Sequence, residues 1–235
     1  MFRLPFKHII CISRIPTRNS ICLFQTSCWF LKDSSSTVDK NQINKSTNLP
    51  KIYTRTGDRG TSVLLGSGPN RIAKDSLIFD VLGTLDELSS TLGIVLSTCS
   101  LPEISKELEN IQCCLFEIGS CVAANNRSSR FVFNDSTLIE NLEKQIDQMT
   151  EELPPLRHFI LPGGGSKTAS YLHFSRAVCR RCERLLTKWS NNQTEEQQKT
   201  IMGIYLNRLS DYLFTLARYI TYKEGHKEIT YHKSK

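Results

Sequence analysis

Apolar residues recur every three or four positions in five stretches of the chain, which is the period of an α-helix that buries one face. The apolar positions of the first three stretches are Val81, Leu85, Leu88, Leu92, Val95 and Cys99; Ile104, Leu108, Ile111, Leu115, Ile118 and Val122; and Leu138, Leu142, Ile146, Met149 and Leu153. Those of the last two are Tyr171, Phe174, Val178, Cys182, Leu185 and Trp189; and Met202, Leu206, Leu209, Leu213, Leu216 and Ile220. Five amphipathic helices with short connections predict an all-α fold, an antiparallel five-helix bundle.

The sequence also predicts where some helices begin and end. Ser136 and Ser166 stand just before the third and fourth stretches, where a side-chain oxygen can cap free backbone N–H groups. Pro154 and Pro155 end the third helix, because proline has no backbone N–H to donate within a helix. Before the fourth helix, Gly163–Gly165 either allow the backbone to approach a ligand closely or form a plain connector.

The fourth helix carries most of the candidate chemistry. Four arginines and one glutamate lie in the nine residues from Arg176 to Arg184, and the helical step of about 100° aligns Arg176, Arg180 and Glu183 on one stripe. Arg176 and Arg180 are like charges four residues apart, which costs roughly 0.2–0.5 kcal/mol on an isolated helix. We therefore expect an anion between them, although a solvated basic face would show the same pattern.

The fifth helix has a polar stripe opposite its apolar face, formed by Asn207, Asp211 and Arg218. Core packing does not require an amide and a carboxylate at these positions. Two consecutive helices with separate polar stripes therefore indicate a ligand site or a subunit interface.

A segment before the first helix has the composition of an anion-binding loop. Thr54–Ser62 combines two glycines, several hydroxyl side chains and two arginines. Glycines expose backbone N–H groups and arginines neutralise phosphate, but the spacing of a Walker A loop is absent. Lys74 follows and supplies another cation. The same composition also fits a surface turn.

The net charge of +7 is concentrated at the N-terminus. Residues 1–32 contain five basic residues and no acidic one, and the remaining 25 basic and 23 acidic residues leave only +2. This basic leader predicts a mitochondrial transit peptide over residues 1–32, a flexible linker over residues 33–50 and a folded domain over residues 51–235. No apolar run approaches the roughly 20 residues of a membrane span, so we expect no membrane partner. Because most of the excess positive charge lies in the leader and the domain lacks an interleaved aromatic and basic surface, we expect no nucleic-acid partner either.

Six cysteines lie within the predicted domain, at Cys99, Cys113, Cys114, Cys121, Cys179 and Cys182. Their apolar or flanking positions on the predicted helices favour buried free thiols, and we expect no disulfide framework. Cys179 and Cys182 have the spacing of a metal or redox pair. No second pair accompanies them, which favours a structural role.

Five motifs stand out in order along the chain: Ile52–Gly60, Gly83–Ser89, Phe159–Gly164, Leu172–Arg184 and Tyr205–Phe214. Together they resemble the ATP:cob(I)alamin adenosyltransferases of the trimeric, five-helix type, a mitochondrial enzyme family of vitamin B12 metabolism. The resemblance extends from Lys51 to about Lys227. The chain departs from the family pattern in its longer glycine run, in Ser89, which replaces a common asparagine, and in Ser67–Ala73, which does not align cleanly.

The resemblance implies a nucleotide site and a corrinoid site. The implied ATP-binding residues are Thr54, Arg55, Thr56, Gly57, Ser62, Lys74, Arg180, Arg181, Cys182, Glu183, Arg184 and Asn207. Mg²⁺ would be carried by the ATP phosphates, Phe159 would pack beneath the corrin in place of its lower ligand, and Asp211 would belong to the cobalamin side. The implied catalytic residues are Arg180, Arg176 and Asp86, with Asp86 paired to Arg176 across a subunit boundary.

The implied reaction transfers the 5′-deoxyadenosyl group of ATP to cob(I)alamin, forming adenosylcobalamin and releasing triphosphate. The implied setting is the mitochondrial matrix, with a homotrimer whose active sites lie between subunits and with transient contacts to a cobalamin reductase and to methylmalonyl-CoA mutase. The alternative is a chaperone that binds adenosylcobalamin and delivers it to a mutase. Only an enzyme needs the full ATP loop and Arg180.

Overall fold

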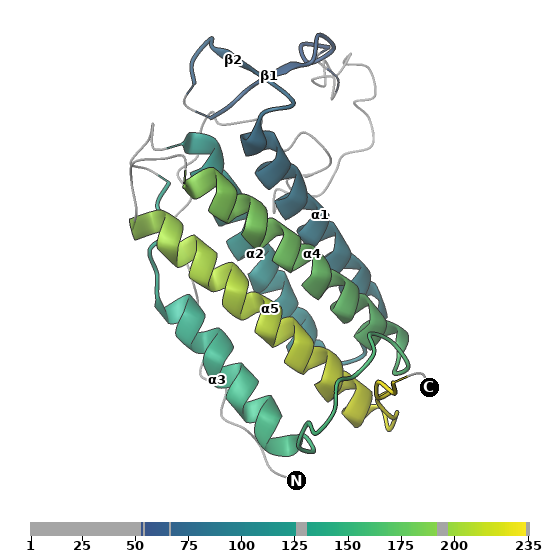
Figure 1. Ribbon diagram of the computed structural model, residues 1–235. Helices are drawn as coiled ribbons and strands as arrows, with labels where there is room; N and C mark the ends of the chain where they lie inside the picture. Colours follow the sequence, from purple (N-terminus) through teal and green to yellow (C-terminus); the bar gives the residue numbers. More distant parts are fainter. Residues whose placement is uncertain (1–52, 54, 66, 126–130, 192–196, 234–235) are drawn as a thin grey trace, which may run out of the picture. The chain divides into compact units, whose positions relative to one another are not determined.

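The computed structural model describes residues 53, 55–65, 67–125, 131–191 and 197–233. Within these residues the chain forms five helices preceded by a small hairpin (Figure 1). The helices are α1 Leu77–Thr98, α2 Pro102–Ala124, α3 Thr137–Glu152, α4 Lys167–Ser190 and α5 Gln197–Lys223. The predicted five-helix bundle is therefore confirmed. The predicted transit peptide, the predicted linker and Thr54 lie outside the described residues.

Helix α4 lies between two other helices of the bundle. It packs against α1 and α5, while α2 packs on α1 and α3 packs on α5 (Figure 1). Every apolar position predicted for the fifth helix is buried, and Leu206 and Leu213 have no exposed surface. Burial of a leucine side chain contributes about 1.5–3 kcal/mol. These contacts hold α4 against α5 and so fix the spacing of the polar side chains that the two helices carry.

The buried face of α4 differs from the predicted one. Val178, Cys182 and Trp189 are buried as expected, but Tyr171 and Phe174 are 37% and 51% exposed. The observed face includes Leu172, Ser175, Cys179, Cys182 and Leu186. The prediction was wrong here because Ser175 occupies a core position. Its hydroxyl donates to the Tyr171 carbonyl (2.9 Å), so a polar residue is tolerated there and breaks the apolar pattern.

The two predicted serine caps have different outcomes. Ser166 Oγ accepts a hydrogen bond from the backbone N–H of Ala169 (3.2 Å), which confirms the cap of α4. Ser136 stands at the N-cap position of α3 but makes no capping hydrogen bond. Asp135 takes this role instead, because its Oδ1 accepts from the backbone N–H of Thr137 (2.9 Å).

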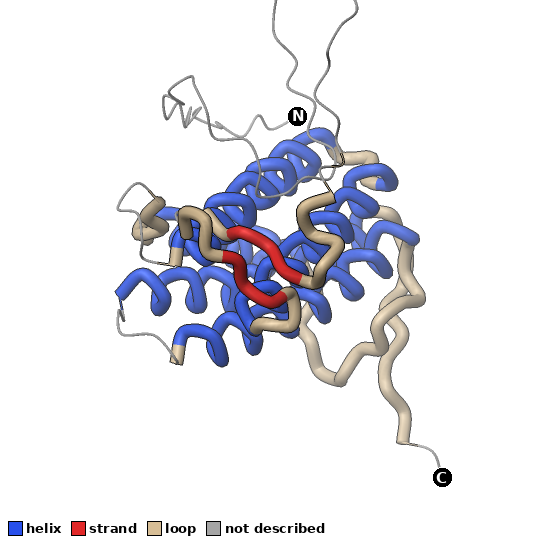
Figure 2. The backbone as a smooth tube through the Cα atoms, turned by 90° about the horizontal axis from the view of Figure 1, so that it is seen from above, coloured by secondary structure: helices blue, strands red, loops and turns tan. Residues whose placement is uncertain are grey.

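The structure adds two short β pairings that the hydrophobic pattern does not predict. Strands β1 (Thr61–Val63) and β2 (Arg71–Ala73) form an antiparallel hairpin, which Figure 2 shows across one end of the bundle. Near the C-terminus, Ile160 pairs with Thr230 in an isolated antiparallel bridge. Segments this short have too few residues to show a periodicity. None of the described helices combines the length and the apolarity needed to cross a membrane.

Candidate active site

A cluster of polar side chains joins α4 to α5. Asn207 Nδ2 on α5 donates a hydrogen bond to Glu183 Oε1 on α4 (2.9 Å). Arg180 Nη1 lies 3.7 Å from Glu183 Oε2 and 3.5 Å from the Ser210 hydroxyl. Arg180, Glu183 and Asn207, which the sequence places on two separate helices, thus meet in one place. We call Arg180, Glu183, Asn207 and Ser210 the α4–α5 polar cluster.

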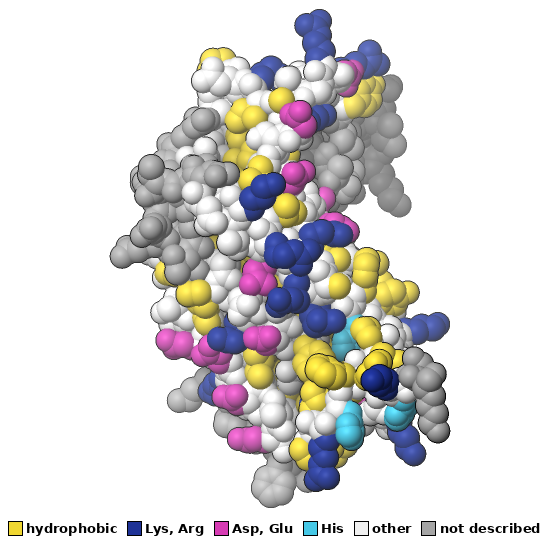
Figure 3. All heavy atoms as spheres, in the orientation of Figure 1, with side chains coloured by type: hydrophobic (Ala, Val, Ile, Leu, Met, Phe, Trp, Pro, Cys, Tyr) yellow, Lys and Arg dark blue, Asp and Glu magenta, His cyan; other side chains and the backbone are white. Residues whose placement is uncertain are grey.

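Further guanidinium groups extend this cluster along α4. Arg184 Nη1 donates to the Arg180 carbonyl (3.1 Å), and Arg181 forms an ion pair with Glu87 on α1. All three arginines are exposed, and Figure 3 shows Lys and Arg side chains gathered over the middle of one face of the molecule. This face therefore offers positive charge to an anion. Cys182, although implied among the ATP-binding residues, has a fully buried side chain.

The predicted anion-binding loop is braced by Arg71 of strand β2. Arg71 Nη2 donates to the carbonyls of Thr56 (2.5 Å) and Thr61 (2.7 Å), and its Nε donates to the Thr61 hydroxyl (2.8 Å). The sequence pattern assigns no role to Arg71, because the residue lies in a stretch without periodicity. Its three hydrogen bonds tie the loop to the hairpin.

Lys74 lies against the same loop. Its backbone N–H donates to the Gly60 carbonyl (2.9 Å), and a Cβ atom at Gly57 would lie 3.0 Å from Lys74 Nζ. Gly57 thus leaves room for a cation beside the loop backbone. Arg55 has a φ of 57°, which is uncommon for a residue other than glycine and recurs at ligand sites. Ser62 lies half-buried on β1, opposite Ile72.

Arg176 and Asp86 do not pair within the chain. Arg176 Nε is buried and has no hydrogen-bond partner among the described residues, and its guanidinium lies 6.0 Å from the centre of the Phe214 ring. Asp86 is half-buried on α1 and forms no ion pair in the part of the chain that the structure describes. Neither charged group therefore has an ion-pair partner among the described residues.

His173 is a polar residue of this region that sequence analysis missed. It is buried on α4, its Nδ1 has no hydrogen-bond partner among the described residues, and its ring lies 6.0 Å from that of Phe214. Burial lowers the pKa of His173, and the neighbouring Arg176 charge lowers it further, so the ring is neutral at pH 7. Its position on the buried face of α4 did not distinguish His173 in the hydrophobic pattern.

Phe159 and Asp211, the residues implied for cobalamin, lie in different surroundings. The Phe159 side chain is 83% exposed, more than any other large hydrophobic side chain that the structure describes. Asp211 Oδ2 accepts from Arg208 Nη1 (2.9 Å), and Arg208 Nε donates to Glu143 on α3 (2.8 Å). Asp211 thus takes part in a group of ion pairs between α5 and α3, and its role toward cobalamin stays a prediction.

Arg218 does not belong to the polar stripe predicted for the fifth helix. It is 7% exposed, and its guanidinium donates to both carboxylate oxygens of Glu228 (2.7 and 3.4 Å) and to the Pro154 carbonyl (2.9 Å). A buried guanidinium requires such partners, because an unpaired charge in the interior is costly. The prediction was wrong because it took no account of the C-terminal segment that supplies Glu228.

The glycine run before α4 serves internal packing. Gly163 and Gly164 have φ values of 115° and 83°, which other residues rarely adopt. A Cβ atom at Gly164 would lie 2.4 Å from Ile229 Cδ1, and one at Gly165 would lie 2.4 Å from Thr221 Oγ1. The close approach is therefore to the chain's own side chains.

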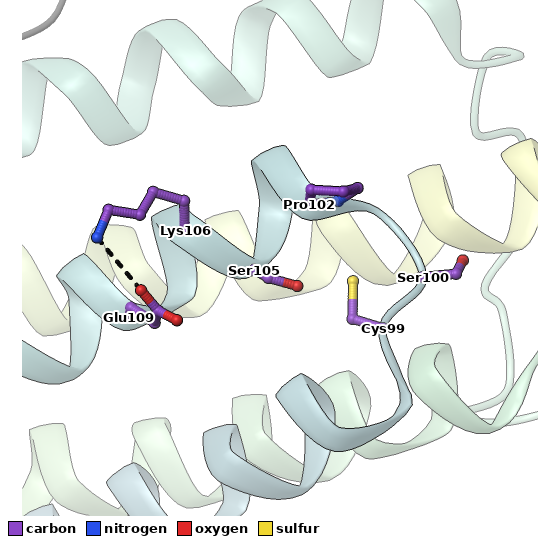
Figure 4. A pocket seen from close by; sticks show the side chains of 6 residues that line it. All are labelled: Cys99, Ser100, Pro102, Ser105, Lys106 and Glu109. Atoms are coloured by element: carbon purple, nitrogen blue, oxygen red, sulfur yellow. Dashed lines mark hydrogen bonds and ion pairs between the residues drawn. The ribbon is translucent and has the colours of Figure 1, made fainter.

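A surface pocket of about 400 Å³ lies where α1 turns into α2 (Figure 4). Figure 4 shows Lys106 and Glu109 side by side at its edge, in an ion pair of 3.3 Å. The residues that line it are Cys99, Ser100, Pro102, Ser105, Lys106 and Glu109. None of the predicted site residues contributes to it.

Cys179 and Cys182 behave as core residues. Both side chains are fully buried, and Cys179 Sγ donates to the Leu206 carbonyl (3.2 Å). Burial raises the pKa of Cys182 to about 12 and that of Cys179 well above its usual value, which disfavours the thiolate needed for redox chemistry or metal binding. Cys121 is also buried, but Cys113 is exposed and so departs from the expected burial.

We expect alkylation of the native protein by iodoacetamide at pH 8 to modify Cys113 rapidly and Cys179 and Cys182 only after unfolding. The reason is that exposure and thiolate fraction both control the rate. Mass spectrometry of peptides after timed quenching measures each site separately. Equal labelling of Cys113 and Cys182 in the folded protein would contradict the assignment of the pair to the core.

Comparisons with known proteins identify the family of this chain. Residues 52–220 match the family model described as cobalamin adenosyltransferase. The chain is 44% identical over 199 residues to the corrinoid adenosyltransferase MMAB of Bos taurus, covering 81% of this chain and 80% of that protein. It is 39% identical over 188 residues to the corrinoid adenosyltransferase of Bacillus subtilis, covering 78% of this chain and 93% of the relative.

Solved structures give the same assignment. A variant PduO-type ATP:corrinoid adenosyltransferase from Lactobacillus reuteri, complexed with cobalamin and ATP, aligns with a TM-score of 0.70 at 34% identity, over 78% of this chain and all of that one. A second variant of that enzyme, complexed with ATP, aligns with a TM-score of 0.70 at 34% identity, over 77% of this chain and 99% of the other. The chain belongs to the cobalamin adenosyltransferase family.

Proposed function

We propose that this chain transfers the 5′-deoxyadenosyl group of ATP to cob(I)alamin, forming adenosylcobalamin and releasing triphosphate. The observation that carries the proposal is the α4–α5 polar cluster, where Arg180, Glu183 and Asn207 meet on an exposed, arginine-rich face. The family to which the chain belongs, and the ATP and cobalamin held by a solved relative, support this activity.

The reaction requires no nucleophile from the protein. The electron pair of Co(I) attacks the 5′ carbon of ATP and forms the cobalt–carbon bond. The bond between that carbon and the triphosphate oxygen breaks, and its electron pair leaves with the triphosphate. The chain therefore has two tasks, which are to orient the substrates and to stabilise negative charge on the leaving group.

Arg180 and Arg184 on α4 suit the second task. Arg180 makes only long contacts with Glu183 and Ser210, so most of its N–H donors are available to phosphate oxygens. Asn207 Nδ2 holds the Glu183 carboxylate, whose other oxygen lies 3.7 Å from Arg180 Nη1. In the loop before α1, Gly57 and Lys74 would contact the same triphosphate.

Mg²⁺ fits this site as a companion of the nucleotide. Within residues 53, 55–65, 67–125, 131–191 and 197–233, no group of three or more His, Cys, Asp and Glu side chains could hold a metal ion. Mg²⁺ keeps several waters and commonly binds through substrate phosphates with few protein ligands. When bound in this way, it would neutralise part of the phosphate charge.

Phe159 would act on the cobalamin. Its exposed ring precedes the glycine run and can present an apolar surface to the lower face of the corrin, where it would displace the dimethylbenzimidazole nitrogen and exclude water. Four-coordinate cobalt is easier to reduce to Co(I), the nucleophile of the reaction.

Replacement of Phe159 by alanine is expected to leave ATP affinity close to wild type and to impair the handling of cobalamin, because the ring touches only the corrinoid. Spectroscopy of bound cob(II)alamin should lose its four-coordinate signal. Leu156→Ala, another exposed apolar residue of the same connection, is the matched control. Survival of the signal in the Phe159 variant would show that Phe159 does not displace the lower ligand.

The activity is tested by combining the purified chain, ATP and chemically reduced cobalamin, and by following the absorbance change of adenosylcobalamin formation. Product formed in proportion to the enzyme concentration, with release of triphosphate, supports the proposal. Tight binding of adenosylcobalamin without its formation would instead support the alternative, a chaperone that delivers the cofactor to a mutase.

We further propose that the chain works as a homotrimer with active sites between subunits in the mitochondrial matrix. The resemblance and the basic leader support the location, and the unpaired charges of Arg176 and Asp86 support the assembly. A cobalamin reductase that supplies Co(I) and methylmalonyl-CoA mutase, which would receive the product, are the expected transient partners.

A further inference from the structure

The C-terminal residues form a strap that turns back after α5 and contacts the segment between α3 and α4. Helix α5 ends in a Schellman motif, in which the Gly225 N–H donates to the Tyr222 carbonyl (3.1 Å) and the His226 N–H donates to the Thr221 carbonyl (2.9 Å). Gly225 has a φ of 71°, as this motif requires. The chain reverses at this point. We call residues 224–233 the C-terminal strap.

The strap is bound to the loop that carries Phe159. The Leu161 N–H donates to the Ile229 carbonyl (2.8 Å), and the Tyr231 N–H donates to the Phe159 carbonyl (2.7 Å). The Ile229 side chain also fills the space beside Gly164 that any Cβ atom there would occupy. The strap and the loop thus form a small, closely packed β pairing.

An ion pair between the buried Arg218 and the half-buried Glu228 anchors the strap to α5. Arg218 Nε lies 2.7 Å from Glu228 Oε1, and the same guanidinium donates to the Pro154 carbonyl at the end of α3 (2.9 Å). One side chain therefore links α5, the strap and the connection that leads to Phe159. The ion pair is bidentate, since Arg218 Nη2 also donates to Glu228 Oε2 (3.4 Å). Bidentate geometry fixes the relative orientation of the two groups as well as their distance.

The exposure of Phe159 makes its position depend on this backbone pairing. Its ring is almost free of contacts within the chain, so packing does not hold it, and only its backbone fixes where it points. We propose that Arg218 and Glu228 are positioning residues for cobalamin binding, which act on Phe159 through the C-terminal strap. The inference rests on the proposed function, because it assigns Phe159 to the corrin.

Two variants of the full chain test the strap by different means. Glu228→Gln removes the charge that anchors it, and Tyr231→Pro removes the N–H that bonds to the Phe159 carbonyl without changing any charge. Each should lower kcat/KM for cob(I)alamin by roughly 10- to 100-fold, the scale on which small misplacements near the reacting centre act. Each should also weaken the four-coordinate signal of bound cob(II)alamin. The KM for ATP and the melting temperature of Tyr231→Pro should stay close to wild type.

Glu224→Gln is the matched control, because Glu224 is an exposed acid of the same strap and its side chain makes no hydrogen bond among the described residues. It should behave as wild type.

Wild-type kcat/KM and an undiminished four-coordinate signal in both test variants would overturn the inference, as would a parallel rise in the KM for ATP. Should Glu228→Gln fail to fold, Tyr231→Pro decides alone. A wild-type chain that forms no adenosylcobalamin would contradict the proposed function, and the cob(II)alamin signal would still test the strap.

Discussion

Replacement of Arg180 by alanine is expected to lower turnover by on the order of 10²–10³-fold, the usual effect of removing one preorganised charge from a transition state. Its side chain is 49% exposed and lies outside the buried face of α4, so the fold should persist. In the proposed reaction, the guanidinium lost in this variant would face the leaving triphosphate. The measurements are kcat at saturating ATP and cobalamin, and the melting temperature.

Lys188→Ala supplies the control for this variant. Lys188 is an exposed cation in the last turn of the same helix, so its removal changes the net charge equally but touches no residue of the α4–α5 polar cluster. It should keep a near-normal rate. An Arg180→Ala enzyme with normal melting and a near-normal rate would end the assignment of Arg180 to the triphosphate.

The helices of this protein are predictable because their core faces repeat. The apolar positions predicted for α5 are all buried, and those predicted for α1, α2 and α3 are buried or half-buried. Helical periodicity depends only on neighbours three and four residues away, so a single sequence contains it. The buried face of α4 is predicted wrongly at Tyr171 and Phe174. Ser175 is buried and its hydroxyl is satisfied by a local hydrogen bond, but in the sequence it counts as a polar position.

The polar site is predictable only as far as it follows helical stripes. Glu183 and Asn207 lie 24 positions apart and meet because α4 packs on α5, which the two apolar faces already imply. The partner of Arg218 cannot be predicted from helical stripes. Its partner Glu228 is brought to it by the reversal at Gly225, and no periodic pattern encodes that reversal. The same holds for Arg71, whose hydrogen bonds depend on a hairpin with three-residue strands.

The assembly is tested most directly through Asp86. Asp86 and Arg176 each carry a charge without an ion-pair partner among the described residues, and Arg176 Nε is already buried in the single chain. If the two groups meet between subunits, their pair becomes enclosed in the assembled protein. Loss of one member of an enclosed pair costs roughly 3–5 kcal/mol, because the other charge stays buried without compensation.

Asp86→Ala should therefore weaken the proposed trimer and the activity together, measured by light scattering and by adenosylcobalamin formation over a range of protein concentrations. Glu87→Ala is the matched control, since Glu87 is the adjacent acid on α1 but pairs with Arg181 of the same chain. The exchange Asp86→Arg with Arg176→Asp should partly restore both properties, because it reverses the pair and leaves both charges compensated. A fully active monomer at working concentration would contradict an active site built between subunits.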